Sequence, residues 1–492
     1  MCQATAASEQ EAAKPRPTGR KRLWMFRILA CSLALFLFLV AEVACRLFGL
    51  GDPNLGADLF AGFQEVRPLF VLGESGGRYQ IPESRYNFFA PESFPKAKQP
   101  REKRIFCLGG STVQGRPYST PTSFPTFLEL GLNATDQSAD WEVVNCGGIS
   151  YASYRLVPIL EEVLAYQPDI IILCTGHNEF LEDRSYHHLK DSSSLLSQSL
   201  WVASHSWLFN AVSQIAHSKT ERPKLSAETD PILDYNDGLA AYHRDDEWHE
   251  NVIAHFAHNV RKIIQIAEES KVAIALVVPP SNLDDCPPFK SASKRNLSDD
   301  EHVRFQRLRT QARDLMRNDP QGAVSLFREA IAIDDRHAAT WYQLGQCFQT
   351  LGLRSQAHEA FVRARDEDIC PLRILSRMEE QLREIADEYN VPILDVSVLM
   401  HDGRSLVDHV HPDFEGHQDI AKRLMELMFE YRWCQLEAEW QEHCDRRFLT
   451  HMDLLDDFYY LRGQRTLEAL QAWTEGRADG PPVENRFPDR IR

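Results

Sequence analysis

Five short apolar runs, separated by stretches of helical pattern, constrain the fold of this chain more than any other feature. The runs are short, β-branched and largely apolar, and they lie at 104–108, 142–145, 169–174, 272–278 and 391–396. Strands of a parallel sheet have this composition when helices cover both faces. The alternation therefore predicts an α/β fold, with a doubly wound (flavodoxin-like) parallel sheet of about five strands.

A purely helical segment interrupts this alternation between the fourth and fifth runs, at 297–370. Two stretches within it, AVSLFREAIAID from Ala323 and AHEAFVRARDED from Ala357, are similar to each other. Their offset is the roughly 34-residue period of the tetratricopeptide repeat. The segment resembles one such repeat with a half-repeat before it. Because fewer than three repeats are short for a free-standing array, we expect it to pack on the α/β domain.

The N-terminus carries a topology signal. Residues 1–22 are polar and basic, and an apolar stretch follows that is about as long as the roughly 20 residues of a membrane-spanning helix. We expect a cytoplasmic tail at 1–22, a single-pass transmembrane anchor in the cell membrane at 23–46, and the rest of the chain outside the cytoplasm, in the periplasm or its equivalent. A cleaved signal peptide is the alternative, although the stretch is long for one and no clean cleavage site follows.

Charge and cysteine spacing exclude several classes of function. The net charge is −17, and no Lys/Arg patch lies outside the N-terminus, so we expect no nucleic-acid partner. The 11 cysteines show no metal-binding spacing and no disulfide framework. Cys107, Cys146 and Cys174 lie in or beside apolar runs, and we expect them to be buried. The sequence indicates no cofactor and no metal.

A glycine-rich turn follows the first apolar run. The segment RIFCLGGSTVQG places two glycines directly before Ser111. Ligands bind at the carboxyl ends of the strands in open α/β sheets, so Ser111 would stand where a substrate binds. The segment is not a GxSxG elbow, because Val113 replaces the second glycine. A phosphate-binding loop is the competing interpretation, but the segment contains neither GxxxxGK[ST] nor GxGxxG.

A later segment, LVDHVHPDFEGHQDIAKRL, supplies a candidate base and acid. Asp408 and His411 are three residues apart, so that one turn presents both side chains. We expect His411 to remove the Ser111 proton, and Asp408 to fix the imidazole tautomer and stabilise the imidazolium. A surface histidine in an acidic loop is the alternative. His409 and His417 also leave a metal site open as an interpretation.

Two segments offer donors for an oxyanion hole. The sequence GHNEF follows the third run, and the Asn178 side chain in it can donate an N–H to a developing oxyanion. An asparagine that caps the next helix is the structural alternative. The second run opens into a glycine-containing loop, in which the backbone N–H groups of Gly148 and Ser150 are candidate donors together with that of Ser111.

These four segments resemble the four blocks of the SGNH (GDSL-like) hydrolase superfamily, in the family's order along the chain. The resemblance covers roughly 100–290 and 371–430. The family's serine, asparagine and histidine correspond to Ser111, Asn178 and His411, and its Asp-x-x-His-Pro ending matches the residues from Asp408. The resemblance implies a serine hydrolase that forms its oxyanion hole from these blocks.

The chain departs from the family pattern at two places. Gly110 replaces the usual aspartate before the nucleophile, and we expect this change not to affect catalysis directly. In the second block the family's glycine corresponds to a residue within 147–150, and Ser150 occupies the expected position. A backbone N–H is the same donor from serine as from glycine, so we expect the function to survive.

The segments together predict six regions. They are the tail at 1–22, the anchor at 23–46, the hydrolase domain at 51–296, the helical insertion at 297–370, the rest of the hydrolase domain at 371–434, and C-terminal helices with a tail at 435–492. The predicted function is a membrane-anchored serine esterase acting on ester bonds of an envelope carbohydrate or lipid. An O-acyltransferase of the same fold is the first alternative. A catalytically idle scaffold that binds a protein partner through the repeats is the second.

Overall fold

The structure is a computed structural model, and it describes residues 19–48, 62–63, 65–183, 208, 224–234, 238–398 and 405–475. The chain forms two compact units. One unit spans 1–59 and 187–222 and contains helix α1 (Gly19–Phe48). The other spans 60–186 and 223–492 and contains all the predicted site residues. The fold and the site described below belong to this second unit.

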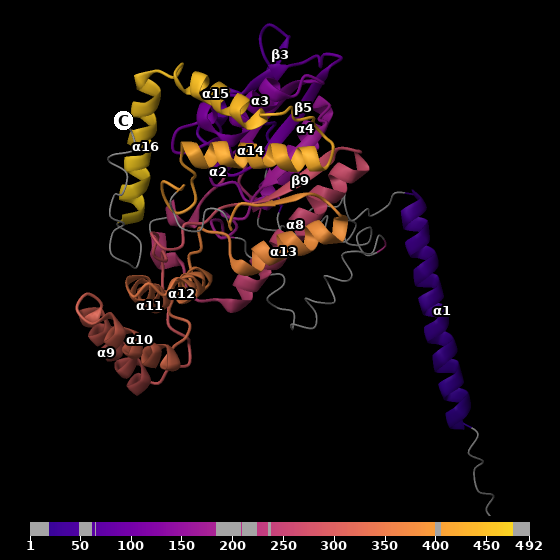
Figure 1. The fold of residues 1–492 in the computed structure, drawn as a ribbon. Coiled ribbons are helices and arrows are strands. Elements are labelled where there is room, and N and C mark those ends of the chain that lie inside the picture. The colour runs from indigo at the N-terminus through magenta and orange to yellow at the C-terminus, as the bar shows by residue number, and fades with distance from the viewer. Residues whose placement is uncertain are drawn as a thin grey trace, which may run out of the picture. The chain divides into compact units, whose positions relative to one another are not determined.

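A parallel sheet of five strands forms the centre of the second unit (Figure 1). All neighbouring pairs are parallel. The strands, in spatial order, are β10 (Ile393–Asp395), β9 (Ala273–Val278), β7 (Ile170–Cys174), β5 (Glu102–Gly109) and β6 (Asp140–Gly147). In chain order this is the 2-1-3-4-5 arrangement of flavodoxin-like folds. The predicted α/β class with a parallel five-stranded sheet is confirmed.

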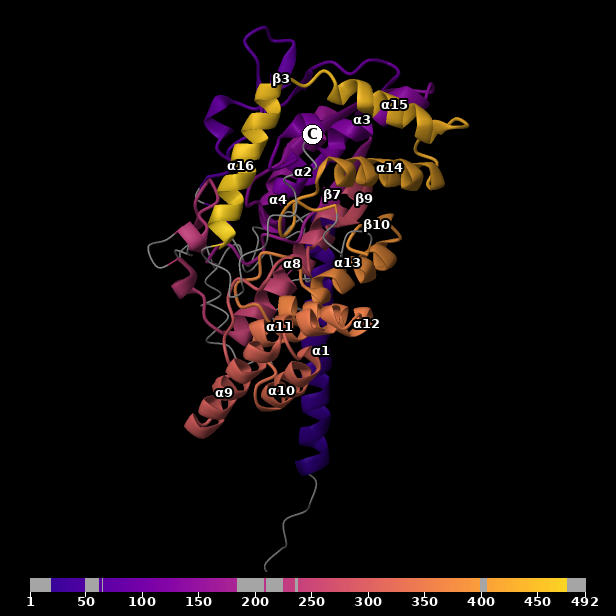
Figure 2. The same cartoon turned by 60° about the vertical axis from the view of Figure 1, so that its left-hand side comes forward.

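Helices cover both faces of this sheet (Figures 1 and 2). Ile105 and Cys107 of β5 belong to a buried core with side chains of α3 (Phe124–Thr135), α14 (Phe414–Glu430) and α15 (Trp440–Met452). Helices that contact the sheet outside this core are α4 (Ser153–Val163), α8 (Asp246–Glu269) and α13 (Ser376–Tyr389). Because apolar layers lie on both sides, the strands need no polar face, as their composition predicts. The three cysteines expected to be buried, Cys107, Cys146 and Cys174, are at most 3% exposed.

Smaller elements complete the second unit. β1 (Gly62–Phe63) pairs with β8 (Lys224–Leu225), and a separate antiparallel sheet contains β2 (Val71–Leu72), β3 (Arg78–Gln80) and β4 (Ser93–Pro95). Helix α16 (Asp457–Glu475) follows α15. Gly463 of α16 lies against the Tyr118 ring, so that a Cβ at this glycine would overlap the ring. Residues 476–492, at the end of the predicted C-terminal region 435–492, lie outside the described residues.

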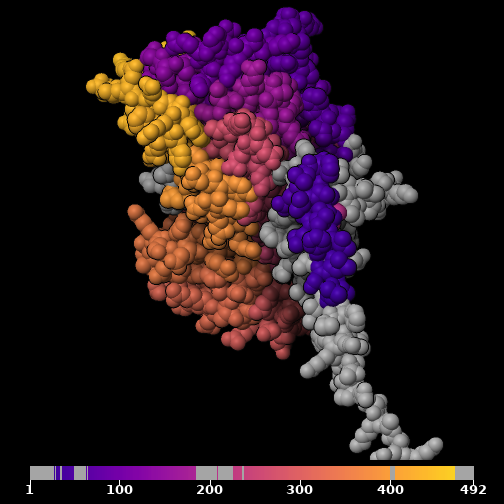
Figure 3. All heavy atoms as spheres, turned by 90° about the vertical axis from the view of Figure 1, so that its right-hand side faces the viewer, coloured from indigo at the N-terminus to yellow at the C-terminus, as the bar shows by residue number. Residues whose placement is uncertain are grey.

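The helical insertion consists of four consecutive helices: α9 (Asp299–Leu315), α10 (Pro320–Ile333), α11 (Ala338–Thr350) and α12 (Arg354–Asp366). They lie at the surface of the unit (orange in Figure 3). The residues that recur in the two similar stretches are all buried: Ala323, Phe327, Ala330, Ala357, Phe361 and Ala364. A Cβ on Gly345 would lie 2.6 Å from the Phe361 ring, which shows how closely α11 and α12 pack. The segment is helical as predicted, and its assignment to the tetratricopeptide class stays a prediction.

The predicted membrane anchor falls within α1. Of the helices that the structure describes, none has the length and apolar character to cross a bilayer. In α1 the side chains of residues 19–26, 28, 31, 34 and 35 lie outside the described part, as does the chain before residue 19. The anchor therefore stays a prediction. The predicted domain boundaries also stay predictions.

Candidate active site

The carboxyl ends of β5, β6 and β7 meet at one edge of the sheet. Gly109, at the end of β5, pairs in register with Gly147 of β6 and with Cys174 of β7. The chain then turns through Gly110 into the short helix α2 (Ser111–Gln114), so that Ser111 is its first residue and is half-buried. In the 2-1-3-4-5 order the strand connections diverge between β5 and β7, and ligands bind at such points.

A tight turn presents the candidate base and acid to this edge. Leu406 and Pro412 form an isolated antiparallel bridge that closes the turn. Inside it, Asp408 Oδ1 accepts the backbone N–H groups of Val410 and His411, each at 2.9 Å. These bonds hold the Asp408 carboxylate in one orientation, with Oδ2 free to face the imidazole. The three-residue spacing thus places the Asp408 and His411 side chains on one turn.

The structure brings Ser111, His411 and Asp408 into one hydrogen-bonded chain. His411 Nε2 lies 2.7 Å from Ser111 Oγ, although the two residues are 300 positions apart in the sequence. His411 Nδ1 lies 2.6 Å from Asp408 Oδ2. Both the histidine and the aspartate are buried, at 4% and 8% exposure. The candidate nucleophile, base and orienting carboxylate therefore form an unbroken series of hydrogen bonds.

The low pKa of Asp408 determines which atom donates in each hydrogen bond between Ser111, His411 and Asp408. Burial alone would raise the pKa of Asp408, but the neighbouring His411 and His409, with the hydrogen bonds from His411 and Val410, outweigh it and hold that pKa well below its usual range. An ionised carboxylate only accepts hydrogen bonds, so His411 Nδ1 carries the proton and donates it to Asp408. His411 Nε2 is then the acceptor for the Ser111 hydroxyl, which is the arrangement of a general base.

Asn178 lies in the turn after β7, close to Gly110, the residue before Ser111. Its Nδ2 donates to the backbone oxygen of Tyr151 at 3.0 Å. The next residue, Glu179, is fully buried and accepts the backbone N–H of Ser153 at 2.7 Å and the Ser153 hydroxyl at 3.0 Å. The turn after β7 is thus tied to the loop after β6. An amide nitrogen has two N–H groups, so one remains for a substrate oxygen.

Gly110 leaves the space that the Asn178 amide occupies. A Cβ at position 110 would lie 2.6 Å from Asn178 Nδ2. The sequence predicts that this position does not affect catalysis directly, whereas the structure shows the glycine in contact with a candidate oxyanion donor. The contact joins turns that follow two different strands, so no local pattern reveals it.

The two candidate donors in the loop after β6 differ in availability. The N–H of Gly148 donates to the backbone oxygen of Gly109 at 3.0 Å, so it is already engaged. Ser150 has φ of +62°, in the left-handed region, and in the described part of the chain its N–H has no hydrogen-bond acceptor. The same holds for the N–H of Ser111. Of the two loop candidates, Ser150 is therefore the better donor.

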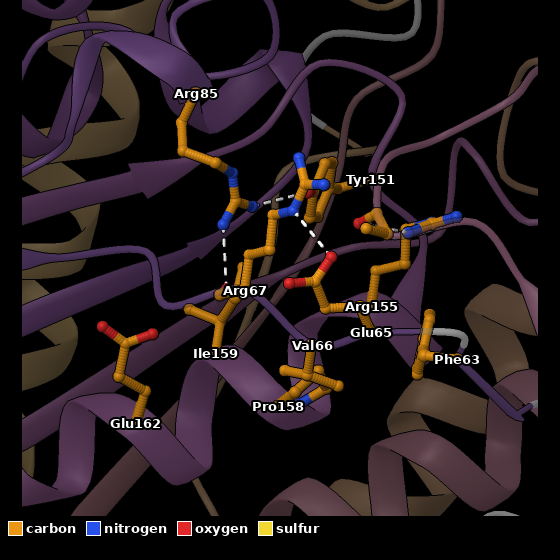
Figure 4. Close-up of a pocket in the computed structure, with 11 residues that line it drawn as sticks. Phe63, Glu65, Val66, Arg67, Arg85, Tyr151, Arg155, Pro158, Ile159 and Glu162 are labelled. Atoms are coloured by element: carbon orange, nitrogen blue, oxygen red, sulfur yellow. Dashed lines mark hydrogen bonds and ion pairs between the residues drawn. The ribbon is translucent and has the colours of Figure 1, made fainter.

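Tyr151 is one of the residues that line a pocket (Figure 4). Arg85 Nη2 donates to the Tyr151 hydroxyl at 2.8 Å, and burial raises the pKa of this phenol to about 12. Arg85 Nη1 also donates to the Arg67 backbone oxygen, and Arg67 pairs with Glu65. These cationic groups are held by partners within the protein. Through the bond from Arg85 to Tyr151, this region is joined to the loop that carries Ser150.

The histidines near the site have structural partners. His417 Nδ1 accepts the backbone N–H of Phe124 at 3.2 Å, and burial lowers the pKa of His417 to about 3. The His409 ring packs edge-on against Phe289, at 5.3 Å between centroids. Among the described residues, no group of three or more His, Cys, Asp or Glu side chains is arranged to hold a metal ion. The metal interpretation of His409 and His417 therefore has no support from their geometry.

Asn282, in the loop after β9, contacts the turn that carries Asp408 and His411. Its side-chain Nδ2 donates to the backbone oxygen of Asp408 at 3.2 Å, and its backbone N–H donates to that of His409 at 2.9 Å. In the sequence, Pro279-Pro280-Ser281-Asn282 follows the fourth apolar run, but no pattern singles out this contact. The only available signal is the position of Asn282 at the carboxyl end of a parallel strand.

No family model and no curated protein matches the chain. Solved structures that resemble it include a lipolytic protein of the G-D-S-L family from Desulfitobacterium hafniense DCB-2, at 12% identity and TM-score 0.29, covering 66% of this chain and 99% of that one. The acetyl xylan esterase AlAXEase matches at 11% identity and TM-score 0.30, covering 66% and 98%. Axe2, an acetylxylan esterase from Geobacillus stearothermophilus, matches at 13% and 0.29, covering 68% and 96%. At TM-scores this low, we infer the function from the geometry of the site alone.

Proposed function

We propose that this protein is a serine carboxylic-ester hydrolase. The observation that carries the proposal is the continuous hydrogen-bonded chain from Ser111 Oγ through His411 to Asp408, at 2.7 Å and 2.6 Å. A serine hydroxyl is a weak nucleophile unless a base within this reach removes its proton, and a third group must hold that base in the correct tautomer. Both requirements are met at the edge of a sheet where ligands bind.

The reaction proceeds through an acyl-enzyme. Ser111 Oγ attacks the ester carbonyl carbon while its proton passes to His411 Nε2, and Asp408 stabilises the resulting imidazolium. The carbonyl oxygen becomes an oxyanion that accepts hydrogen bonds from the N–H groups of Ser111 and Ser150 and from Asn178 Nδ2. When this intermediate collapses, His411 gives its proton to the departing alcohol. Water then attacks the acyl-enzyme by the same sequence and releases the acid.

An acyltransferase would use the same acyl-enzyme, with a hydroxyl group of an acceptor in place of water. Nothing in the described site is specific to such an acceptor, so hydrolysis is the proposal. An idle scaffold would not need Asp408 held by two backbone N–H groups and aligned on His411. We further propose an O-acyl ester of an envelope carbohydrate or lipid as substrate, because the predicted anchor would place the enzyme at that surface.

Turnover of a short-chain aryl ester, p-nitrophenyl acetate, tests the proposal. Ser111→Ala and His411→Ala are each expected to abolish turnover and to leave the melting temperature close to that of the wild type. Ser325→Ala is the matched control, because the Ser325 hydroxyl only bonds to Gln321 within an exposed stretch of helix. Turnover near the wild-type rate in Ser111→Ala would refute the assignment of the nucleophile.

We also propose that the hydrolase domain lies outside the cytoplasm. The basis is the basic N-terminal segment followed by the apolar stretch at 23–46. A C-terminal reporter that is active only after export is expected to work. Activity of a reporter that functions only in the cytoplasm would contradict this topology, and it would leave the proposed chemistry untouched.

A further inference from the structure

The catalytic turn rests on the loop that follows β9. Asn282 of this loop makes two hydrogen bonds to the turn: from its backbone N–H to His409 O at 2.9 Å, and from Nδ2 to Asp408 O at 3.2 Å. It is 4% exposed, so these bonds are shielded from water. Because Asp408 and His411 share one short turn, a shift of the Asp408 backbone moves the base as well as the acid.

A buried arginine also holds this loop. Arg373 is 2% exposed, and its Nη1 donates to the backbone oxygens of Asn282 and Cys286, each at 2.8 Å. The Asn282 side-chain oxygen in turn accepts the N–H of Asp285 at 3.1 Å. The backbone N–H, the carbonyl and both ends of the Asn282 side-chain amide are therefore engaged, which leaves this residue little freedom to move.

The two residues that follow Asn282 attach the loop to the helical insertion. Leu283 is 4% exposed and belongs to the hydrophobic core of the insertion, together with Phe327, Phe348 and Phe361. The hydroxyl of Tyr342, on α11, donates to the backbone oxygen of Asp284 at 2.8 Å. Three consecutive residues thus link the two regions: Asn282 contacts the turn that carries Asp408 and His411, while Leu283 and Asp284 contact the insertion.

We infer that Asn282 is a positioning residue for the Asp408–His411 turn, and that the helical insertion sets its position through Leu283 and Tyr342. The inference rests on the proposed serine hydrolase function. The insertion is then part of the structure that aligns the base, rather than an appended module. A displacement of α11 is transmitted to His411 through three residues of one loop.

The expected effects follow from the need of the Ser111–His411 pair for close alignment. A misplacement of about 1 Å costs on the order of a hundredfold in rate. Asn282→Ala removes one bond to the turn, and we expect kcat to fall by about tenfold to a hundredfold, with KM within about twofold of the wild type. Tyr342→Phe keeps the ring packed and removes only the hydroxyl, so we expect a smaller loss in kcat, of about threefold to tenfold.

Thr350→Val is the matched control for Tyr342→Phe. It also removes one hydroxyl from α11, but that hydroxyl is exposed and bonds only to Gln346 of the same helix. Its kcat is expected to equal that of the wild type. The experiment measures kcat and KM on p-nitrophenyl acetate and the rate of labelling by a fluorophosphonate, for the full chain, well below the melting temperature.

The outcomes separate this inference from the proposed function. A lowered kcat and a slowed labelling rate in Asn282→Ala and Tyr342→Phe, with KM nearly constant, support the positioning role. A purely structural role predicts lower melting temperatures with the wild-type kcat, and that result overturns the inference while the hydrolase function stands. A folded wild-type protein that neither turns over the ester nor becomes labelled overturns the proposed function itself.

Discussion

Replacing Gly110 by alanine tests whether the Asn178 amide stabilises the oxyanion. Gly110 has φ of −88° and ψ of −156°, an extended conformation that alanine adopts without strain. The added Cβ would lie 2.6 Å from Asn178 Nδ2, whereas ordinary contact begins at 3.4 Å. The amide must therefore move by about 0.8 Å, or the backbone at the nucleophile must shift by a similar amount.

The size of the effect follows from the geometry of an oxyanion hole. Donors act at about 2.7–3.1 Å from the oxyanion, and the loss of one costs about 10²–10³ in kcat, or roughly 2.7–4 kcal/mol. A displacement of the size required here removes most of that contribution. The same substitution restricts the unfolded chain, which stabilises a protein by about 0.4–1 kcal/mol and offsets part of the local strain. We therefore expect a large loss of turnover with little change in stability.

The assay compares Gly110→Ala with Gly77→Ala by ester turnover and thermal unfolding. A Cβ on Gly77 meets no atom closer than 3.9 Å, so this variant is a matched control for the glycine-to-alanine change. We expect kcat to fall by about a hundredfold in Gly110→Ala and to stay at the wild-type value in Gly77→Ala. Wild-type turnover in Gly110→Ala would show that the Asn178 amide does not act at its observed position.

Three further predictions concern single side chains. Asn178→Ala is expected to lower kcat by about a hundred- to thousandfold with little change in KM or melting temperature; a lowered melting temperature with normal turnover would instead favour a purely structural role in the turn after β7. Asp408→Asn is expected to lower kcat by about 10⁴-fold, because the amide disfavours the required His411 tautomer, and a loss below tenfold would contradict its orienting role. Burial raises the pKa of Glu92 to about 7, so the folded state binds this proton more tightly than the unfolded state. The stability that comes from binding this proton is fully present below the pKa of Glu92 in the unfolded chain, and it is lost as the pH rises through about 7. Glu92→Gln is thus expected to raise the melting temperature more at pH 8 than at pH 5, and an equal shift at both would show that this group is not perturbed.

Much of the fold could be predicted because each part depends on local sequence. Each of the five strands overlaps one of the short apolar runs, and β5 and β6 extend beyond theirs at both ends. The composition of the runs indicates burial on both faces, and layers of helices cover both faces of the sheet. Ser111 and the pair Asp408 and His411 could be singled out because each lies in a compact motif. The topology places the carboxyl ends of parallel strands at one edge, which brings these motifs together.

The remaining features depend on contacts between distant segments. The closeness of Gly110 to Asn178, and the engagement of the Gly148 N–H by Gly109, result from how neighbouring strand ends meet. Asn282 bonds to Asp408 across 126 positions. No periodicity or spacing encodes such contacts, because they form only when the sheet and the insertion are packed. The role of the insertion at the site could therefore not be read from its repeat pattern.

The most direct test of the proposed chemistry is the site of covalent labelling. The folded full-length protein is incubated with a fluorophosphonate, and the modified peptide is identified by mass spectrometry. We predict a single adduct on the Ser111 hydroxyl, at a rate that falls sharply in His411→Ala, and no adduct in Ser111→Ala. An unlabelled wild-type protein, or labelling that persists at the wild-type rate in Ser111→Ala, would contradict the account of this chain as a serine hydrolase.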